Sequence, residues 1–387
     1  MADIIRYAGP GFRERSHRWI NGQHLKVLDA ITRCRTAHWA ATAISARTVG
    51  TLPSPITRAA TGTAHDARAT PACAGLSSAK RELLPTRYVH AVFTLPRELA
   101  PLALQNKRLI YGLLFRASAA TLLEVARDPR HLGAEIGFFS VLHTWDQRLQ
   151  HHPHAHCVIA AGGLSPDHAS WISSRRTFFL PVKVLGRVFR GKFVAGLKAA
   201  FREGKLEFHG QLAPLAEPRS FAAWLRCLFR HDWVIYSKPP FAGPEHALRY
   251  LGAYTHRVGI SNSRLVALSD GKVSFRWRDS VHGNKKRVMS LPIDEFLRRF
   301  LLHLLPRGFV RIRNFGFLAN RQRATLLPLC FRLLQRACDS PALPPQPERT
   351  QVLPKRPLCG GTMHVIERLT TVQLLARSPP VAHRRAA

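Results

Sequence analysis

The chain has 387 residues, with 58 lysines and arginines against 23 aspartates and glutamates, which gives a formal net charge of +35. Because 46% of the residues are hydrophobic, the composition excludes a disordered basic tail and indicates a folded protein whose basic surface suits a polyanion such as nucleic acid. No apolar run approaches the roughly 18 residues that span a membrane, the first residues lack a signal-peptide pattern, and seven scattered cysteines indicate a reducing cytoplasm.

The first predicted element is helical and covers residues 1–37, where apolar residues recur at an approximate helical period. Residues 38–79 are rich in Ala, Thr, Arg, Ser and Pro without periodicity, which predicts a poorly structured region. From Lys80 onward, β-branched and aromatic residues predict three strands, with one helix between the first two. The strands cover 87–95, 136–142 and 155–161, and the helix covers 104–125.

The second half of the chain continues the mixture of helices and strands. A basic segment is helical in its centre, and a short strand follows it. Pro244 stands in the first turn of a helix that we expect to run through Tyr254. Two strands then flank a turn rich in Asp, Gly and Asn, which predicts a β-hairpin before the last helix and a Pro-rich tail. The basic segment covers 178–208, the short strand covers 233–236, and the two hairpin strands cover 273–278 and 286–291. The last helix covers 294–305, and the tail begins at 341.

A histidine-rich run reads HHPHAH at residues 151–156. On a strand, residues two apart share a face, so His154 and His156 converge while Ala155 turns into the core. Two neutral imidazoles at this spacing suit a divalent metal ion. A histidine-rich turn, or histidines without a ligand role, would give the same pattern.

Two tyrosines, Tyr250 and Tyr254, stand four residues apart in a predicted helix. They share one helical face with Cβ atoms roughly 5–6 Å apart, so their hydroxyls could act as alternate nucleophiles that each form an ester. Paired tyrosines also occur as ordinary amphipathic packing. The flanking Arg249 and Arg257 supply positive charge that suits a phosphate and would equally suit a solvated face.

The third feature is a basic region in which aromatic residues alternate with charges. Phosphate contacts combined with base stacking hold single strands without strict sequence readout, whereas a solvated surface over an ordinary core is the alternative. The basic residues are Lys272, Arg276, Arg278, Lys285, Lys286, Arg287, Arg311, Arg313, Arg321 and Arg323, and the aromatic ones are Phe275, Trp277, Phe315 and Phe317.

Together these motifs resemble the insertion sequence 91 family of transposases, which are HUH-type, two-tyrosine, rolling-circle enzymes. The resemblance runs in order from Lys80 to about Leu334. It rests on HTW at 143–145, HPHAHC at 152–157, GGLS at 162–165, RYLGAYTHRV at 249–258 and SN at 261–262, with HAVFTLP at 90–96, VRIR at 310–313 and FLANR at 317–321 in support.

The resemblance implies an α+β fold with an antiparallel-sheet HUH endonuclease-like core and flanking helices. The core would cover 80–270, preceded by a helical segment (1–37) and a degraded zinc-binding region (38–79), and followed by a basic part (271–340) and a flexible tail (341–387). We expect a cytoplasmic, nucleoid-associated bacterial protein without a membrane partner, and the sequence does not specify its oligomeric state.

The resemblance also implies a reaction and its residues. His154 and His156 would hold Mg²⁺ or Mn²⁺, with His143 as the candidate third ligand and Gln147 behind it. Tyr250 or Tyr254 would attack single-stranded DNA at an element end or target site, leaving a 5′-phosphotyrosine and a free 3′-hydroxyl, and the second tyrosine would serve in strand transfer. The expected DNA contacts are Arg249, Arg257, Arg276, Arg278, Lys285, Lys286, Arg287, Arg311 and Arg313.

The chain departs from the family in the zinc-binding region, because no C-x-x-C pair follows CRTA at 34–37. Cys34 and Cys73 alone cannot make a tetrahedral site. Back-translated with free codon choice and read one base out of frame, the stretch can yield CxxCGH and CRNRHCPxC, which suggests a compensated frameshift over about 38–78. A C-terminal knuckle likewise has Arg356 in the place of its first cysteine. We therefore expect no stoichiometric zinc.

Two other functions fit parts of the sequence. A basic protein could bind single-stranded nucleic acid without catalysis, its histidines and tyrosines being structural. Alternatively, a plain metal nuclease could cut without forming a covalent intermediate. An EDTA-sensitive covalent adduct separates the transposase from both.

Overall fold

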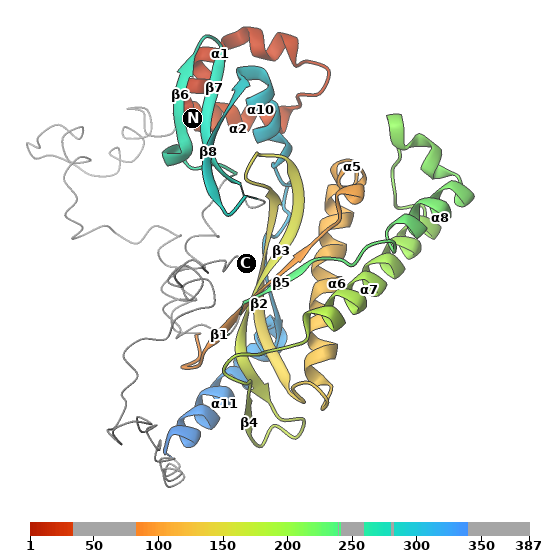
Figure 1. Ribbon diagram of the computed structural model, residues 1–387, viewed down its shortest axis with the longest axis vertical. Helices are drawn as coiled ribbons and strands as arrows, with labels where there is room; N and C mark the ends of the chain where they lie inside the picture. The colour runs from red at the N-terminus through yellow and green to blue at the C-terminus, as the bar shows by residue number, and fades with distance from the viewer. Residues whose placement is uncertain (34–82, 239, 241–258, 280–281, 340–387) are drawn as a thin grey trace, which may run out of the picture. The chain divides into compact units, whose positions relative to one another are not determined.

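The computed structural model describes residues 1–33, 83–238, 240, 259–279 and 282–339 (Figure 1). Its strands are β1 (Tyr88–Thr94), β2 (Glu135–Trp145), β3 (His151–Leu164), β4 (Trp171–Ser173), β5 (Ile235–Ser237), β6 (Leu265–Ser269), β7 (Lys272–Asp279), β8 (Lys285–Pro292) and β9 (Ile312–Gly316). Its α-helices are α1 (Ala2–Arg15), α2 (Gly22–Arg33), α5 (Ala100–Gln105), α6 (Lys107–Arg127), α7 (Val182–Arg202), α8 (Pro218–Cys227), α10 (Ile293–Leu302) and α11 (Asn320–Asp339).

The larger sheet has six strands in the order β5-β1-β3-β2-β9, with β4 paired to β3, and every pair is antiparallel. Its long central hairpin, β2–β3, arises from residues that alternate between two environments. Along β3, Ala155, Cys157 and Ile159 turn toward one apolar core, while Val158 and Ala160 turn toward another. The predicted α+β fold with an antiparallel core is therefore confirmed.

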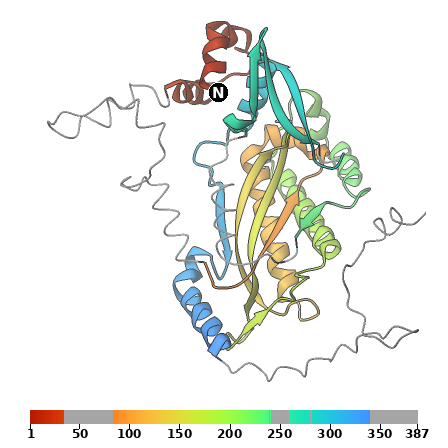
Figure 2. The same ribbon diagram turned by 60° about the vertical axis from the view of Figure 1, so that its left-hand side comes forward.

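Helices cover both faces of this sheet (Figures 1 and 2). One face packs on α5, α6, α7 and α8 through a core that includes Phe93, Phe115 and Phe189. The opposite face packs on α11 through Cys330 and its apolar neighbours, which meet Val141 and Val158. Because α11 covers only part of this face, it does not pack on the end of the hairpin that carries the histidine run.

Helix α6 is apolar nearly all round because it is buried between the sheet and α7. By length and composition alone, α6 could cross a membrane. The expectation that no apolar run is long enough to span a membrane was therefore wrong. In the structure 72% of its most apolar stretch is buried, as in the core helix of a globular protein.

A second core joins segments from the two ends of the described chain. The sheet β6-β7-β8 packs its inner face, including Val273 and Phe275, on α10, and α1 and α2 add Phe12 and Leu28 to the same cluster. Arg15 of α1 also pairs with Asp294 of α10, with Nε 2.7 Å from Oδ2. The predicted N-terminal helical segment is thus two helices, and they share a core with the hairpin near residue 275.

Most predicted elements are present, with shifted ends. Strand β3 begins at His151, four residues before the prediction, because the histidine run continues the pairing with β2. Strands β4, β6 and β9 and helices α8 and α11 were not predicted. The predicted helix from Pro244 to Tyr254 and the region 38–79 lie outside the described residues. The division into parts at residues 80, 271 and 341 stays a prediction.

Candidate metal centre and nucleic-acid interface

Three histidines meet on the face of the large sheet that α11 leaves partly uncovered. His143 of β2 stands directly opposite His154 of β3 in the antiparallel register, and His156 follows two residues along the same face. Their ligand atoms all lie within 4.8 Å of one another. His143 and His156 are buried and His154 is half-buried. The structure therefore brings together the two predicted ligands and the candidate third.

Hydrogen bonds orient two of the three rings in this cluster. Nδ1 of His154 lies 2.7 Å from the carbonyl oxygen of His152. Because a carbonyl only accepts, Nδ1 carries the proton and Nε2 keeps its lone pair. Nδ1 of His156 lies 2.9 Å from Nε2 of His90, a buried histidine of β1. Such outer partners set the tautomer and the orientation of metal-binding imidazoles.

Burial keeps His154 and His156, and their neighbour His90, uncharged at neutral pH. It lowers the pKa of His154 to about 4 and that of His90 to about 4. The pKa of His156 falls below its ordinary value, first because of burial and then because of neighbouring histidines and Arg311. At neutral pH these imidazoles present lone pairs and not charges, which is the form that binds metal ions.

The cluster fits a single metal ion. Two imidazole nitrogens bound to one ion at about 2.1 Å each are at most about 4.2 Å apart, so atoms within 4.8 Å need only small ring rotations to close on it. The metal-ligating group found among the described residues consists of imidazoles alone. Imidazole donors suit transition ions better than Mg²⁺, which prefers carboxylate and water oxygens.

Arg311 lies beside this cluster. Its Nε donates to the carbonyl oxygen of Leu142 at 3.1 Å, and its Cζ is 5.2 Å from the ring centroid of Trp145. The Trp145 ring in turn stacks on His143, with centroids 4.7 Å apart. A partly buried guanidinium held by a backbone carbonyl is a fixed positive charge next to the histidines.

A basic cleft of about 760 Å³ begins on the other side of Trp145. It lies between the β2–β3 turn and the sheet β6-β7-β8. Its lining includes three of the predicted DNA contacts and Gln147, which is exposed in the cleft. The lining residues are Trp145, Gln147, Gly259, Ser261, Ser263, Arg264, Arg276, Trp277, Arg278 and Lys286.

The remaining predicted DNA contacts are dispersed. Lys285 is exposed at the start of β8, and Arg287 pairs with the buried Asp279, Nε to Oδ2 3.1 Å. Arg313 lies over Phe115, with Cζ 4.6 Å from the ring centroid, so it faces the helical layer. The predicted tyrosines and the arginines beside them, at 249, 250, 254 and 257, lie outside the described residues, as do the residues of the zinc-binding region.

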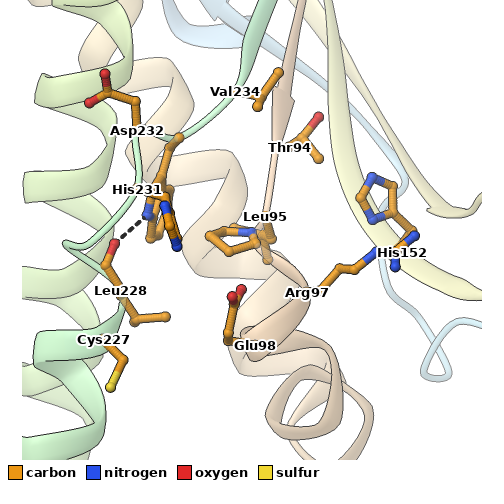
Figure 3. Close-up of a pocket in the computed structure, with 12 residues that line it drawn as sticks. Thr94, Leu95, Arg97, Glu98, His152, Cys227, Leu228, His231, Asp232 and Val234 are labelled. Atoms are coloured by element: carbon orange, nitrogen blue, oxygen red, sulfur yellow. Dashed lines mark hydrogen bonds between the residues drawn. The ribbon is translucent and has the colours of Figure 1, made fainter. Parts of the chain in front are cut away.

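A smaller hollow of about 240 Å³ lies on the side of His152 (Figure 3). Thr94, Leu95 and Arg97, from the end of β1 and the turn after it, form one wall. The loop between α8 and β5 forms the other, where Nε1 of Trp233 donates to the carbonyl oxygen of Leu228 at 2.9 Å. His152 thus lines this hollow; its carbonyl oxygen accepts from His154, and its ring lies beside the His154 ring, with centroids 5.5 Å apart.

Sequence reasoning did not single out His90 as part of the site. A signal was present, because His90 interrupts an otherwise apolar strand at a position that alternation places on the same face as Val92. A polar residue in the buried part of a strand needs a partner, and here that partner is His156, 66 residues further along the chain.

An antiparallel sheet with two histidines on one strand and a third opposite them is the arrangement expected from the sequence resemblance to an HUH endonuclease-like core. A family model described as "Putative transposase", of the Y2 type, matches residues 137–325. The chain is 49% identical over 348 residues to "Putative transposase y4qJ" of Sinorhizobium fredii, covering 88% of this chain and 86% of that protein. It is therefore a member of this transposase family, the insertion sequence 91 type.

Other similarities are weaker. The "Transposase for insertion sequence element IS801" of Pseudomonas savastanoi pv. phaseolicola is 29% identical over 256 residues, 65% of this chain and 59% of that protein. A solved metal-bound conjugative relaxase, TrwC with oriT DNA, shares 13% identity at a TM-score of 0.24, covering 44% of this chain and 71% of the relaxase. Because the similarity to this relaxase is so low, no role of a relaxase residue is assigned to a residue of this chain.

Proposed function

We propose that this transposase nicks single-stranded DNA at the ends of its element by metal-dependent tyrosine attack, and rejoins the strands at a target site by a rolling-circle route. The observation that carries the proposal is the set of three imidazoles whose ligand atoms lie within 4.8 Å on one face of the sheet. Two of them are oriented by outer hydrogen bonds, which is typical of metal sites.

In this proposal His143, His154 and His156 hold Mg²⁺ or Mn²⁺. When bound, the ion polarises the scissile phosphate as a Lewis acid. Of the two ions, an all-imidazole set favours Mn²⁺. Arg311, held beside His156, adds a fixed positive charge where the phosphate gains negative charge in the transition state, which is the usual way a preorganised cation lowers such a barrier.

The nucleophile is the phenolic oxygen of Tyr250 or Tyr254. As its bond to phosphorus forms, the phenol gives up its proton to water; the bond between phosphorus and the 3′-oxygen breaks, and the leaving 3′-oxygen takes up a proton from water. The products are a 5′-phosphotyrosine and a 3′-hydroxyl. The ester conserves the energy of the broken bond, so rejoining needs no ATP.

The flanks of the tyrosine segment support this assignment. On one side, the backbone N–H of Lys238 donates to the carbonyl oxygen of His90 at 3.1 Å. On the other side, Gly259 is buried and lines the same cleft as Trp145. The chain before residues 241–258 therefore contacts His90, the hydrogen-bond partner of His156, and the chain after them lies in the cleft that Trp145 lines.

The test uses labelled single-stranded oligonucleotides from the DNA that flanks the gene, incubated with the full chain and Mn²⁺. A labelled covalent adduct on a denaturing gel is expected, and EDTA should abolish it. The double variant Y250F/Y254F should form no adduct, whereas Y7F, the same change at a 59% exposed tyrosine of α1, should form as much as the wild type. Adduct formation by Y250F/Y254F would refute the tyrosine assignment.

The other outcomes identify the alternative functions. Cleavage without an adduct would indicate a plain metal nuclease. Binding without cleavage would indicate a basic single-strand-binding protein, or a transposase whose damaged N-terminal region has cost it activity. The gene sequence tests the damage directly, because the proposed frameshift requires a shifted reading frame encoding the CxxC and HCPxC motifs. The site of action that we propose is the bacterial cytoplasm, at the nucleoid.

A further inference from the structure

The sheet β6-β7-β8 has two chemically different faces. Its inner face carries Val273 and Phe275, which are fully buried against α10. On the outer face, Arg276, Arg278 and Lys286 are exposed. A strand with one buried and one solvated face normally shows such alternation, so exposure alone assigns no role to the outer residues.

The pairing of the outer residues is unusual. Arg278 of β7 stands directly opposite Lys286 of β8 in the register, and like charges directly opposite each other destabilise an antiparallel pair. Among the described residues no ion pair involves Arg276, Arg278 or Lys286, whereas their neighbour Arg287 pairs with Asp279 at 3.1 Å. The sheet thus places two cations against each other without an internal counter-charge. Local conflicts of this kind are expected at functional sites.

These cations form one wall of the basic cleft of about 760 Å³. The other polar side chains that line it are Arg264, Gln147, Ser261 and Ser263, so no described carboxylate lines the cleft. At its other end the cleft meets Trp145, whose ring stacks on His143 at 4.7 Å. An anion held in the cleft would therefore lie one aromatic ring away from the histidine cluster.

We propose that this cleft holds the stretch of single-stranded DNA adjacent to the phosphate at the histidine cluster, with Arg276, Arg278 and Lys286 contacting its phosphates. The inference rests on the proposed function for the position of that phosphate. Arg276 and Arg278 stand two residues apart, about 7 Å along a strand, a spacing that an extended single strand can follow. A cleft of this size encloses a ligand of drug-like dimensions, which suits a few nucleotides and not the width of a duplex.

The experiment compares two double variants of the full chain that each remove two positive charges. R278Q/K286Q removes the opposed pair in the cleft, and K26Q/K198Q removes two exposed cations of α2 and α7 that lie outside the cleft lining. Affinity for a labelled single-stranded oligonucleotide is measured in EDTA at several salt concentrations. Each phosphate contact contributes about 0.7 to the slope of log K against log salt for single strands.

R278Q/K286Q should reduce that slope by about 1.4, since two phosphate contacts are lost, and K26Q/K198Q should leave it unchanged. Equal reductions in both variants, or none in R278Q/K286Q, would overturn the proposal. An equal reduction on a duplex probe would assign the surface to double-stranded DNA and overturn the single-strand assignment. Because R278Q/K286Q relieves a repulsion, its melting temperature should equal or exceed that of the wild type, and a lower one would contradict the argument from opposed charges.

The binding measurement requires no cutting, so the two proposals can fail separately. A wild-type chain that forms no adduct but shows the cleft-dependent slope would refute the proposed nicking reaction and leave the cleft assignment in place. Normal adduct formation with an unchanged slope in R278Q/K286Q would refute the cleft assignment alone.

Discussion

His90 provides a sharp test of the metal centre, because its side chain contacts a candidate ligand without belonging to the set of three. If His156 binds the metal ion through Nε2, its Nδ1 carries a proton and donates a hydrogen bond to Nε2 of His90, 2.9 Å away. His90 must then be neutral, and burial, reinforced by the nearby charge of Lys238, lowers its pKa to about 4. His90→Ala removes the acceptor and leaves a buried N–H without its partner.

The expected cost follows from the role of such outer partners. Losing one lowers metal affinity by about 10- to 100-fold, equivalent to about 1.4–2.8 kcal/mol. We expect this loss for Mn²⁺ in His90→Ala, measured by calorimetry on the full chain. His90→Gln, whose carbonyl oxygen can accept the same proton, should recover part of the affinity. The control is His152→Ala, which also removes an imidazole beside a ligand, since the rings of His152 and His154 have centroids 5.5 Å apart. The hydrogen bond of His152 to the cluster comes from its backbone, while its side chain lines the smaller hollow (Figure 3), so this control leaves that hydrogen bond in place.

Equal Mn²⁺ affinity in His90→Ala and wild type would refute the reasoning, since His90 would then only fill space. A loss of affinity in His90→Ala that matches the loss in His152→Ala would also refute it, because the effect would not depend on the hydrogen bond to His156. Circular dichroism of each variant separates these outcomes from unfolding.

Three further predictions concern stability. Phe12→Ala should lower the free energy of unfolding of the N-terminal core by about 3–5 kcal/mol, because Phe12 is 2% exposed; Tyr7→Ala, at a 59% exposed position, should change it by less than about 0.5 kcal/mol in chemical denaturation. Burial lowers the pKa of His303 to about 4 from the 6.5 of an exposed histidine, so the unfolded chain takes up this proton first. His303 should therefore contribute on the order of 3 kcal/mol to the loss of stability between pH 6.5 and pH 4. Urea midpoints should show the loss, and His303→Gln should reduce it by that share only, because the buried His90 and His154 titrate in the same direction. Gly316→Ala should destabilise by more than about 1 kcal/mol, because Gly316 has φ +62° and a Cβ there would meet the carbonyl of Ile136, whereas Gly191→Ala meets nothing within 4 Å and should be neutral or stabilising in thermal melts.

The strands of the large sheet could be predicted because their alternation is visible locally. In β3 the side chains at 155, 157 and 159 are small or apolar and face the helical core, so the period of two fixes where His154 and His156 point. The hairpin β7–β8 was predictable for the same reason, together with its turn residues. Both cases depend on patterns within about ten residues of sequence.

The elements that escaped prediction depend on distant contacts. Helix α11 contains Pro328 and several arginines, so its local signal is that of a basic surface segment, and its burial against Val158 decides its structure. Likewise His143 becomes a candidate ligand only because it pairs with His154 in the strand register. His90 can reach His156 only because β1 pairs with β3 on the side away from β2. The spacing of residues along the chain does not reveal which strands pair with each other, so these two assignments could not be made from the sequence.

The described residues on either side of the segment 34–82 are anchored in two different cores. Before it, Leu28 of α2 is 2% exposed in the core shared with β7 and α10. After it, Leu84 is 1% exposed in the core between the sheet and α11. Both anchors lie outside the stretch 38–78 in which we propose the frameshift, so the proposed frameshift would change neither of these two buried residues.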